Sequence, residues 1–136
     1  MTPPSDQGGP LHFRPRHRLR HALEFDAVYG AKMRKTRGPL AVFSMPNTLE
    51  HPRLGLAVGS RAGNAVVRNR WKRVIREAFR LQQHMLPRTE EGHGYDYIVG
   101  VRPGPEQRPW PLSACMKALA ELAAESDREW RRRVNR

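Results

Sequence analysis

Length and charge already limit what this chain can be. Its 136 residues suffice for one domain and leave no room for a second, catalytic one. Lys and Arg total 25 against 13 Asp and Glu, and the net charge of +12 favours a polyanionic partner, nucleic acid before an anionic membrane surface. No apolar run approaches the roughly 20 residues of a membrane span, and the N-terminus lacks the apolar core of a signal peptide. We therefore expect a cytoplasmic protein with no membrane partner.

The N-terminal part is expected to pass from a tail into a short helix. Residues 1–12 are rich in Pro and Gly and show no apolar periodicity, which predicts a disordered tail. The remaining residues, 13–136, are expected to form a single RNA-binding domain. After a basic segment, apolar residues at helical spacing over 23–29 predict a helix that ends at Gly30.

The next stretch predicts a loop and two strands. Residues 32–38 are mostly basic and are interpreted as a loop. Residues 40–45 form a mostly apolar run that predicts a strand, and residues 53–60 place apolar side chains on alternate positions, which predicts a second. Because residues 46–52 make a short link, we expect these two strands to be able to pair as an antiparallel hairpin.

Two longer helices flank a third predicted strand. Helical spacing runs over residues 65–86, Pro87 marks the end, and the side chain of Asn64 is a suitable N-cap for a first-turn amide. Residues 95–101 predict a strand, and apolar residues from Leu112 onward predict a last helix that ends in three arginines. The order is helix, strand, strand, helix, strand, helix. This order is typical of an α/β (α+β) two-layer sandwich, with helices packed on a small sheet.

The helix predicted over residues 65–86 has an apolar side and an opposed basic side when projected at about 100° per residue. Like charges four residues apart weaken an isolated helix, and only Glu77 offsets them in this stretch. A phosphate-rich partner explains this surface better than the alternative, a solvated face, which usually mixes both signs. The apolar side contains Val67, Trp71, Val74, Ile75, Ala78, Leu81 and Met85. The basic side contains Arg68, Asn69, Lys72, Arg73, Arg76 and Arg80, with Arg70 at the boundary.

Residues 63–80, with the sequence GNAVVRNRWKRVIREAFR, resemble the signature of the bacterial ribonuclease P protein family. The family pattern places Gly-Asn-Ala-Val, Arg-Asn-Arg, Lys-Arg and Arg-Glu-Ala-Phe on one helix. Similar segments flank it, so the resemblance covers about residues 14–124. It implies a left-handed β-α-β crossover, which the order of the elements cannot show and which is opposite to the usual hand.

The resemblance also implies an activity, the endonucleolytic removal of the 5′ leader from precursor tRNA by a ribonucleoprotein. In this family an RNA subunit carries the chemistry and holds most of the Mg²⁺, while the protein binds that RNA and the leader. We therefore expect ribonuclease P RNA and precursor tRNA as partners, with no small-molecule substrate, no catalytic side chain and no metal bound by the protein. The residues expected to bind RNA are Arg18, Arg20, Asn64, Arg68, Asn69, Arg70, Lys72, Arg73, Arg76 and Arg80.

Three aromatic residues are the expected binding site of the leader. The family binds the leader in a cleft between the sheet and the N-terminal helix, and matching by position places Phe25, Tyr29 and Phe43 there. Phe25 and Tyr29 are four residues apart, so both rings lie on one helix face, where unpaired bases can stack without sequence preference. The alternative is that all three rings belong to the core, and for Phe43 the two interpretations are equally good.

Other interpretations stay open on the sequence alone. A non-enzymic ribosomal-type protein or an RNA chaperone would share the charge and the basic helix. A DNA-binding module is a further alternative, although a dense run of Arg suits backbone contact better than the reading of base edges. His17 and His21 have no third metal ligand nearby in the sequence and are expected to be solvated or to contact phosphate. Cys115 is expected to be a small apolar residue of the last helix.

Overall fold

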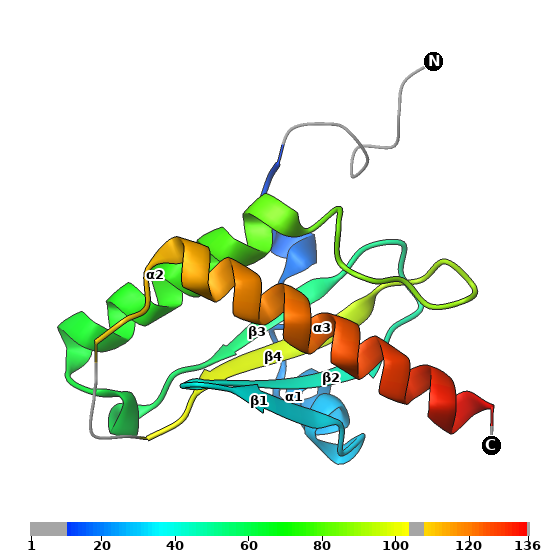
Figure 1. Ribbon diagram of the computed structural model, residues 1–136, viewed down its shortest axis with the longest axis horizontal. Coiled ribbons are helices and arrows are strands. Elements are labelled where there is room, and N and C mark those ends of the chain that lie inside the picture. Colours follow the sequence, from blue (N-terminus) through cyan, green and yellow to red (C-terminus); the bar gives the residue numbers. More distant parts are fainter. Residues whose placement is uncertain (1–10, 104–107, 136) are drawn as a thin grey trace.

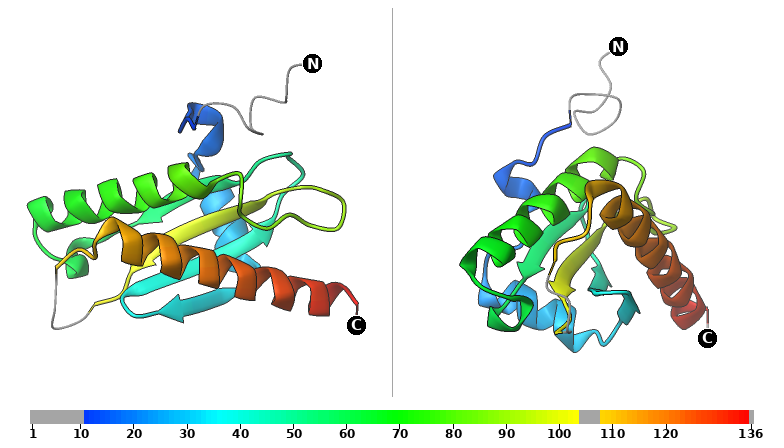
Figure 2. Two further views of the ribbon diagram at one scale, coloured as in Figure 1. Left: turned by 45° about the horizontal axis from the view of Figure 1, so that its top comes forward. Right: turned by 60° about the vertical axis from the view of Figure 1, so that its left-hand side comes forward.

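A four-stranded sheet with helices on both faces forms this protein (Figure 1). The computed structural model describes residues 11–103 and 108–135. Two helices cover one face of the sheet and a third covers the other (Figure 2), which confirms the predicted sandwich and adds a layer to it. The elements are, in chain order, η1 (Pro15–His17), α1 (Ala22–Gly30), β1 (Arg34–Arg37), β2 (Leu40–Pro46), β3 (Arg53–Ala57), η2 (Ser60–Ala62), α2 (Ala65–Gln82), β4 (Tyr95–Val101) and α3 (Leu112–Val134).

The strand order β1-β2-β4-β3 corrects two predictions. β2 does not form a hairpin with β3, because β4 lies between them and pairs antiparallel with β2 and parallel with β3. β1, interpreted from the sequence as a loop, pairs antiparallel with β2, and the chain turns at Gly38, whose φ of 56° is left-handed. β1 is an edge strand with the side chains of Arg, Lys, Thr and Arg, so no apolar alternation marks it in the sequence.

The connection from β3 through α2 to β4 is left-handed, as the family resemblance implied. In Figure 1, β3 and β4 point the same way, β3 lies above β4, and α2 runs back in front of the sheet. A path that circulates in this direction while moving from β3 down to β4 describes a left-handed turn. Most parallel β-α-β connections have the opposite hand.

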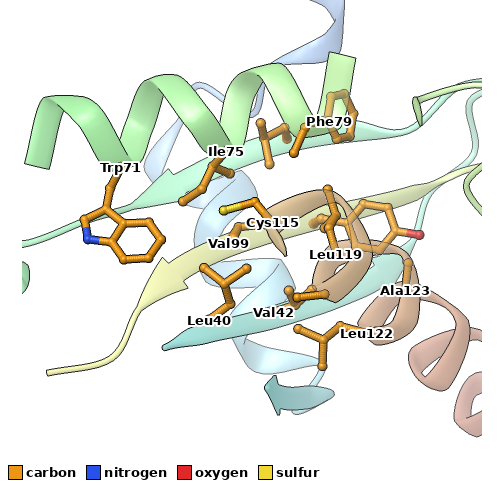
Figure 3. Packing of buried hydrophobic residues seen from close by; sticks show 14 of the residues in the cluster. Leu40, Val42, Trp71, Ile75, Phe79, Val99, Cys115, Leu119, Leu122 and Ala123 are labelled. Atoms are coloured by element: carbon orange, nitrogen blue, oxygen red, sulfur yellow. The ribbon is translucent and has the colours of Figure 1, made fainter. Parts of the chain in front are cut away.

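The larger core lies between the sheet and the helix pair α2 and α3. Trp71, Ile75 and Phe79 of α2 lie opposite Cys115 and Leu119 of α3, over the central strands (Figure 3), and all five are almost fully buried. Burying an apolar side chain of this size contributes roughly 1.5–3 kcal/mol. This packing confirms Cys115 as a core residue and fixes which side of α2 faces outward.

α2 ends at Gln82, four residues before the predicted end, and two assignments near this end are wrong. Met85, predicted on the apolar side, lies beyond the helix and is 83% exposed. Phe79, absent from the predicted apolar side, is fully buried and meets the ring of Phe13 at a centroid distance of 5.8 Å. The contact with Phe13 comes from a segment that a helical projection cannot include.

The last two residues of the predicted tail, Leu11 and His12, make hydrogen bonds with α2 and the residue that follows it. The carbonyl of Leu11 accepts a hydrogen bond from Arg80 Nη1 at 3.0 Å, and the carbonyl of His12 accepts one from Gln83 Nε2 at 2.7 Å. These two residues are therefore attached to the end of α2. The rest of the predicted tail, residues 1–10, lies outside the described residues.

A second, smaller cluster lies on the opposite face of the sheet, under α1. Its fully enclosed members are Leu19, Val28 and Ile98, and the rings of Phe25 and Phe43 pack against them while staying partly exposed. Val28 is the one residue of α1 that is fully buried. This face of the sheet is therefore covered only in part, and aromatic side chains line its open portion.

Candidate nucleic-acid interface

The outer side of α2 is a surface of arginine and lysine side chains. Its N-terminus is fixed by Asn64, whose Oδ1 accepts a hydrogen bond from the Val67 amide at 3.0 Å, which confirms the predicted cap. Capping uses the side-chain oxygen of Asn64 and leaves its amide nitrogen as the group that can contact RNA. Within the part of the chain that the structure describes, no acidic side chain pairs with the five cations Arg68, Arg70, Lys72, Arg73 and Arg76.

These five cations follow one another closely on a single helix, with Asn69 exposed among them. Each guanidinium can donate two parallel hydrogen bonds to a phosphate. Repulsion among the five opposes folding until a polyanion neutralises them. The arrangement is thus suited to a rigid stretch of phosphate backbone, and whether these residues bind RNA stays a prediction.

Arg80 differs from the other cations of α2. Its Nε and Nη2 donate to the carboxylate of Glu77 at 2.9 and 2.6 Å, and its Nη1 donates to the carbonyl of Leu11. The Glu77 carboxylate raises the pKa of Arg80, and the guanidinium in turn lowers the pKa of Glu77. Three donors of Arg80 are therefore occupied within the protein, so we expect it to contribute less to RNA binding than its position in the sequence suggested.

Arg18 and Arg20 lie away from α2, in the segment that precedes α1. They line an open depression of about 260 Å³ with Pro15, Arg16, His21, Glu24 and Arg53. The guanidinium of Arg18 also lies 4.9 Å from the centre of the Phe13 ring. The structure thus places these two predicted RNA-binding residues in a second basic area beside the N-terminus of α1.

An ion network attaches the N-terminus of α1 to the sheet. Arg53 on β3 donates to both carboxylate oxygens of the buried Asp96 at 2.9 and 2.8 Å, and to Glu24 of α1 at 2.9 Å. The other oxygen of Glu24 accepts from the backbone amides of Arg20 and His21. These two amides, together with Arg53, lower the pKa of Glu24. The network therefore fixes the entry of α1 beside the aromatic residues.

The three predicted leader-binding residues lie together on the face of the sheet that α1 covers. The rings of Tyr29 and Phe43 meet edge to face at a centroid distance of 4.8 Å and an angle of 80°. Phe25 packs over Gly55, where a Cβ atom would come within 2.7 Å of Phe25 Cζ. Tyr29 is 38% exposed, and partial burial raises the pKa of its phenol, so it stays neutral at ordinary pH.

Two features of this area were missed or misjudged from the sequence. Arg34 of β1 pairs in register with Phe43, and its guanidinium lies 5.9 Å from the centre of that ring, so a cation borders the aromatic residues. Reading β1 as a loop hid this contact. His17, expected to be solvated or to contact phosphate, is buried, because its Nδ1 accepts from the Arg14 amide and its ring packs edge-on against His51.

The sequence profile of the family described as Ribonuclease P matches residues 13–123. The chain belongs to this family. The ribonuclease P protein component of Chromobacterium violaceum is 39% identical over 114 residues, which cover 82% of this chain and 89% of that protein. The corresponding component of Methylococcus capsulatus is 42% identical over 87 residues, 63% of each chain.

Solved structures of bacterial RNase P proteins have the same fold. The protein from Thermotoga maritima superposes with a TM-score of 0.65 at 27% identity, covering 79% of this chain and 96% of that one. The protein from Staphylococcus aureus gives a TM-score of 0.66 at 24% identity, covering 81% and 94%. Membership of the ribonuclease P protein family therefore rests on sequence and fold together.

No group of three or more His, Cys, Asp and Glu side chains among residues 11–103 and 108–135 could hold a metal ion. None of the helices in these ranges combines the length and the apolar character that crossing a bilayer requires.

Proposed function

We propose that this protein is the protein subunit of ribonuclease P and assists the endonucleolytic removal of the 5′ leader from precursor tRNA. The observation that carries the proposal is the presence of two separate binding surfaces in a chain of this family. The basic side of α2 and the aromatic residues beside α1 lie on opposite faces of one sheet. Two such surfaces suit two RNA ligands held at once.

The basic side of α2 binds the RNA subunit by contacts to phosphate. Its five cations supply charge, the four guanidinium groups among them supply bidentate donors, and Asn69 adds a neutral donor and acceptor at the centre of the group. Such contacts position an RNA without reading its bases. Arg18 and Arg20, in the second basic area, extend the contact with RNA beyond α2.

The aromatic residues bind the leader. Tyr29 is 38% exposed and its ring lies beside Phe43, and Phe25 lies on the same helix face as Tyr29. Unpaired bases stack on such rings irrespective of their identity, so leaders of different sequence can be bound. Arg34, next to Phe43, can neutralise a leader phosphate.

The chemistry itself belongs to the RNA subunit. Mg²⁺ held mainly by that RNA would supply the Lewis-acid chemistry of the hydrolysis. The protein contributes binding and orientation, through the basic side of α2 and the aromatic residues beside α1. We place the complex in the cytoplasm.

A reconstitution experiment tests this function. The protein is added to a bacterial ribonuclease P RNA at a Mg²⁺ concentration too low for the RNA to act alone, and cleavage of precursor tRNA is measured. We expect cleavage at the leader junction to be restored by the wild-type protein and much less by an Arg68→Ala, Arg73→Ala double variant. Tight binding to the RNA with no restored cleavage would contradict the proposal and favour a ribosomal-type or chaperone role.

A further inference from the structure

The last part of α3 lies beyond the segment that the family shares. The family match ends at residue 123, whereas α3 continues to Val134. This extension, residues 124–134, continues past β2 and the edge strand β1 (Figure 1). Trp130 Nε1 donates to Ser44 Oγ of β2 at 3.1 Å, and Glu129 lies 3.9 Å from Lys35 Nζ of β1. The extension is therefore attached to the sheet by side chains of its own.

Arg133 connects the extension to the residues that follow α1, the helix on the other face of the sheet. Its Nη1 donates to the carbonyl of Ala31 at 3.0 Å, and its Nη2 donates to the carbonyl of Lys32 at 3.1 Å. The guanidinium also lies 4.9 Å from the centre of the Trp130 ring, which holds it in place. Because α3 and α1 cover opposite faces, these bonds pass around the edge at β1.

The two carbonyls belong to the turn that ends α1. Lys32 has a φ of 56°, an unfavourable value for a residue with a Cβ, and its amide donates to the carbonyl of Tyr29 at 3.1 Å. Arg133 thus binds a strained turn that is hydrogen-bonded to the residue carrying the exposed ring. From Tyr29 the contact continues to Phe43, 4.8 Å away.

The C-terminal end of α1 is also held by Val28, which is fully buried in its last turn, and by the buried Met33 just beyond it. Of its nine residues, Val28 alone is fully buried, and the Glu24 to Arg53 ion pair acts at the opposite end of the helix. Without Arg133, the C-terminal turn of α1 would be held by the buried Val28 and Met33, by its own backbone bonds and by the neighbouring strand β1. Arg133 therefore adds two hydrogen bonds to the turn that directly follows Tyr29, the residue whose ring meets Phe43.

We propose that Arg133 is a positioning residue, and that the C-terminal extension of α3 sets the affinity of the protein for the 5′ leader by fixing Tyr29 against Phe43. The inference rests on the proposed function, because it assigns the leader to these rings. It adds a contribution from a part of the chain that lies beyond the residues matched by the family profile.

The test uses the holoenzyme reconstituted with ribonuclease P RNA, and compares the affinities for precursor and mature tRNA. Arg133→Ala is expected to lower the preference for precursor tRNA roughly fivefold, with unchanged affinity for the RNA subunit. Arg133→Lys, which offers one compact donor group instead of a fork, is expected to recover only part of the preference. The matched control is Arg132→Ala, an exposed neighbour that pairs with Glu129 and does not reach α1.

A double-mutant cycle shows whether Arg133 acts through Tyr29. If it does, Arg133→Ala adds no further loss in a Tyr29→Ala background, whereas a general loss of stability would add in both backgrounds. If Tyr29→Ala abolishes the preference for precursor tRNA while Arg133→Ala leaves it unchanged, the positioning role of Arg133 is overturned and the assignment of the leader site stands. If Tyr29→Ala also keeps the preference, the leader site itself is wrong, and the inference falls with it.

Discussion

Replacing Tyr29 by Ala separates the leader-binding interpretation from a purely structural one. The ring is 38% exposed and its main aromatic contact is the edge-to-face pair with Phe43. Such a pair contributes about 0.5–1.5 kcal/mol beyond area burial, so we expect the variant to lose about 1–2 kcal/mol of folding stability. For a domain of this size, that loss lowers Tm by about 4–8 °C.

The effect on RNA is expected to be larger and selective. Loss of a stacking ring costs about 1–3 kcal/mol per base, which is a loss of about 5- to 150-fold in affinity for precursor tRNA. Affinity for mature tRNA and for the RNA subunit should stay at the wild-type value, because neither involves the leader. Tyr29→Phe keeps the ring and serves as the control, with the preference for precursor tRNA preserved.

The assay measures binding of the reconstituted holoenzyme to the two tRNAs, beside thermal unfolding of the free protein. Truncating a fully buried aromatic side chain costs about 3–5 kcal/mol, which is a fall in Tm of more than about 10 °C. A fall of that size together with an intact preference for precursor tRNA would refute the reasoning. Tyr29 would then be a core residue, and the leader would lie elsewhere.

Three further predictions concern charge. The Arg68→Ala, Arg73→Ala double variant should bind the RNA subunit more weakly while Tm changes little. The control Arg128→Ala, which removes an exposed cation on α3, should leave the affinity for the RNA subunit unchanged. Equal losses of affinity in both variants would assign binding to net charge alone. The logarithm of RNA affinity should fall linearly with the logarithm of salt concentration, with a slope of roughly −3.5 for about five single-strand contacts, and a flat dependence would contradict phosphate binding. The pKa of Glu24 is lower in the folded protein than its ordinary value of 4.5, so the ionised carboxylate stabilises the fold. This stabilisation is fully present above pH 4.5 and is lost as the pH falls through the pKa that Glu24 has in the folded protein. Acid unfolding of Glu24→Gln should therefore depend less on pH in this range than that of the wild type.

The sequence predicted α2 well because three kinds of local signal agree there. An N-cap at Asn64, an apolar side around Trp71 and Ile75, and a basic side opposite to it all specify the same helix in the same orientation. The end of α2 was placed too far along the chain, because Leu86 keeps the helical spacing and is buried in the core although the helix has already ended at Gln82. What stops the helix is decided by tertiary contacts that local spacing does not contain.

Strand pairing and the edge of the site could not be predicted in the same way. Nothing in residues 46–52 shows that β4, from much later in the chain, lies between β2 and β3. β1 is polar on both sides, so its sequence resembles a loop, and the position of Arg34 beside Phe43 follows only from the register. The contact of Arg133 with the end of α1 joins residues about 100 positions apart and has no sequence signal at all.

The way α1 is held follows from what its rings must do. Rings that stack on bases need exposed surface, so they cannot also be buried deeply enough to anchor the helix that carries them. Here burial under α1 is confined to Val28, and an arginine from another element binds each end: Arg53 at the start through Glu24, and Arg133 at the finish through two carbonyls. Polar contacts of this kind fix orientation without covering the aromatic surface. If the rings were merely core residues, neither clamp would be needed, since deeper burial of Tyr29 and Phe43 would hold the helix by itself.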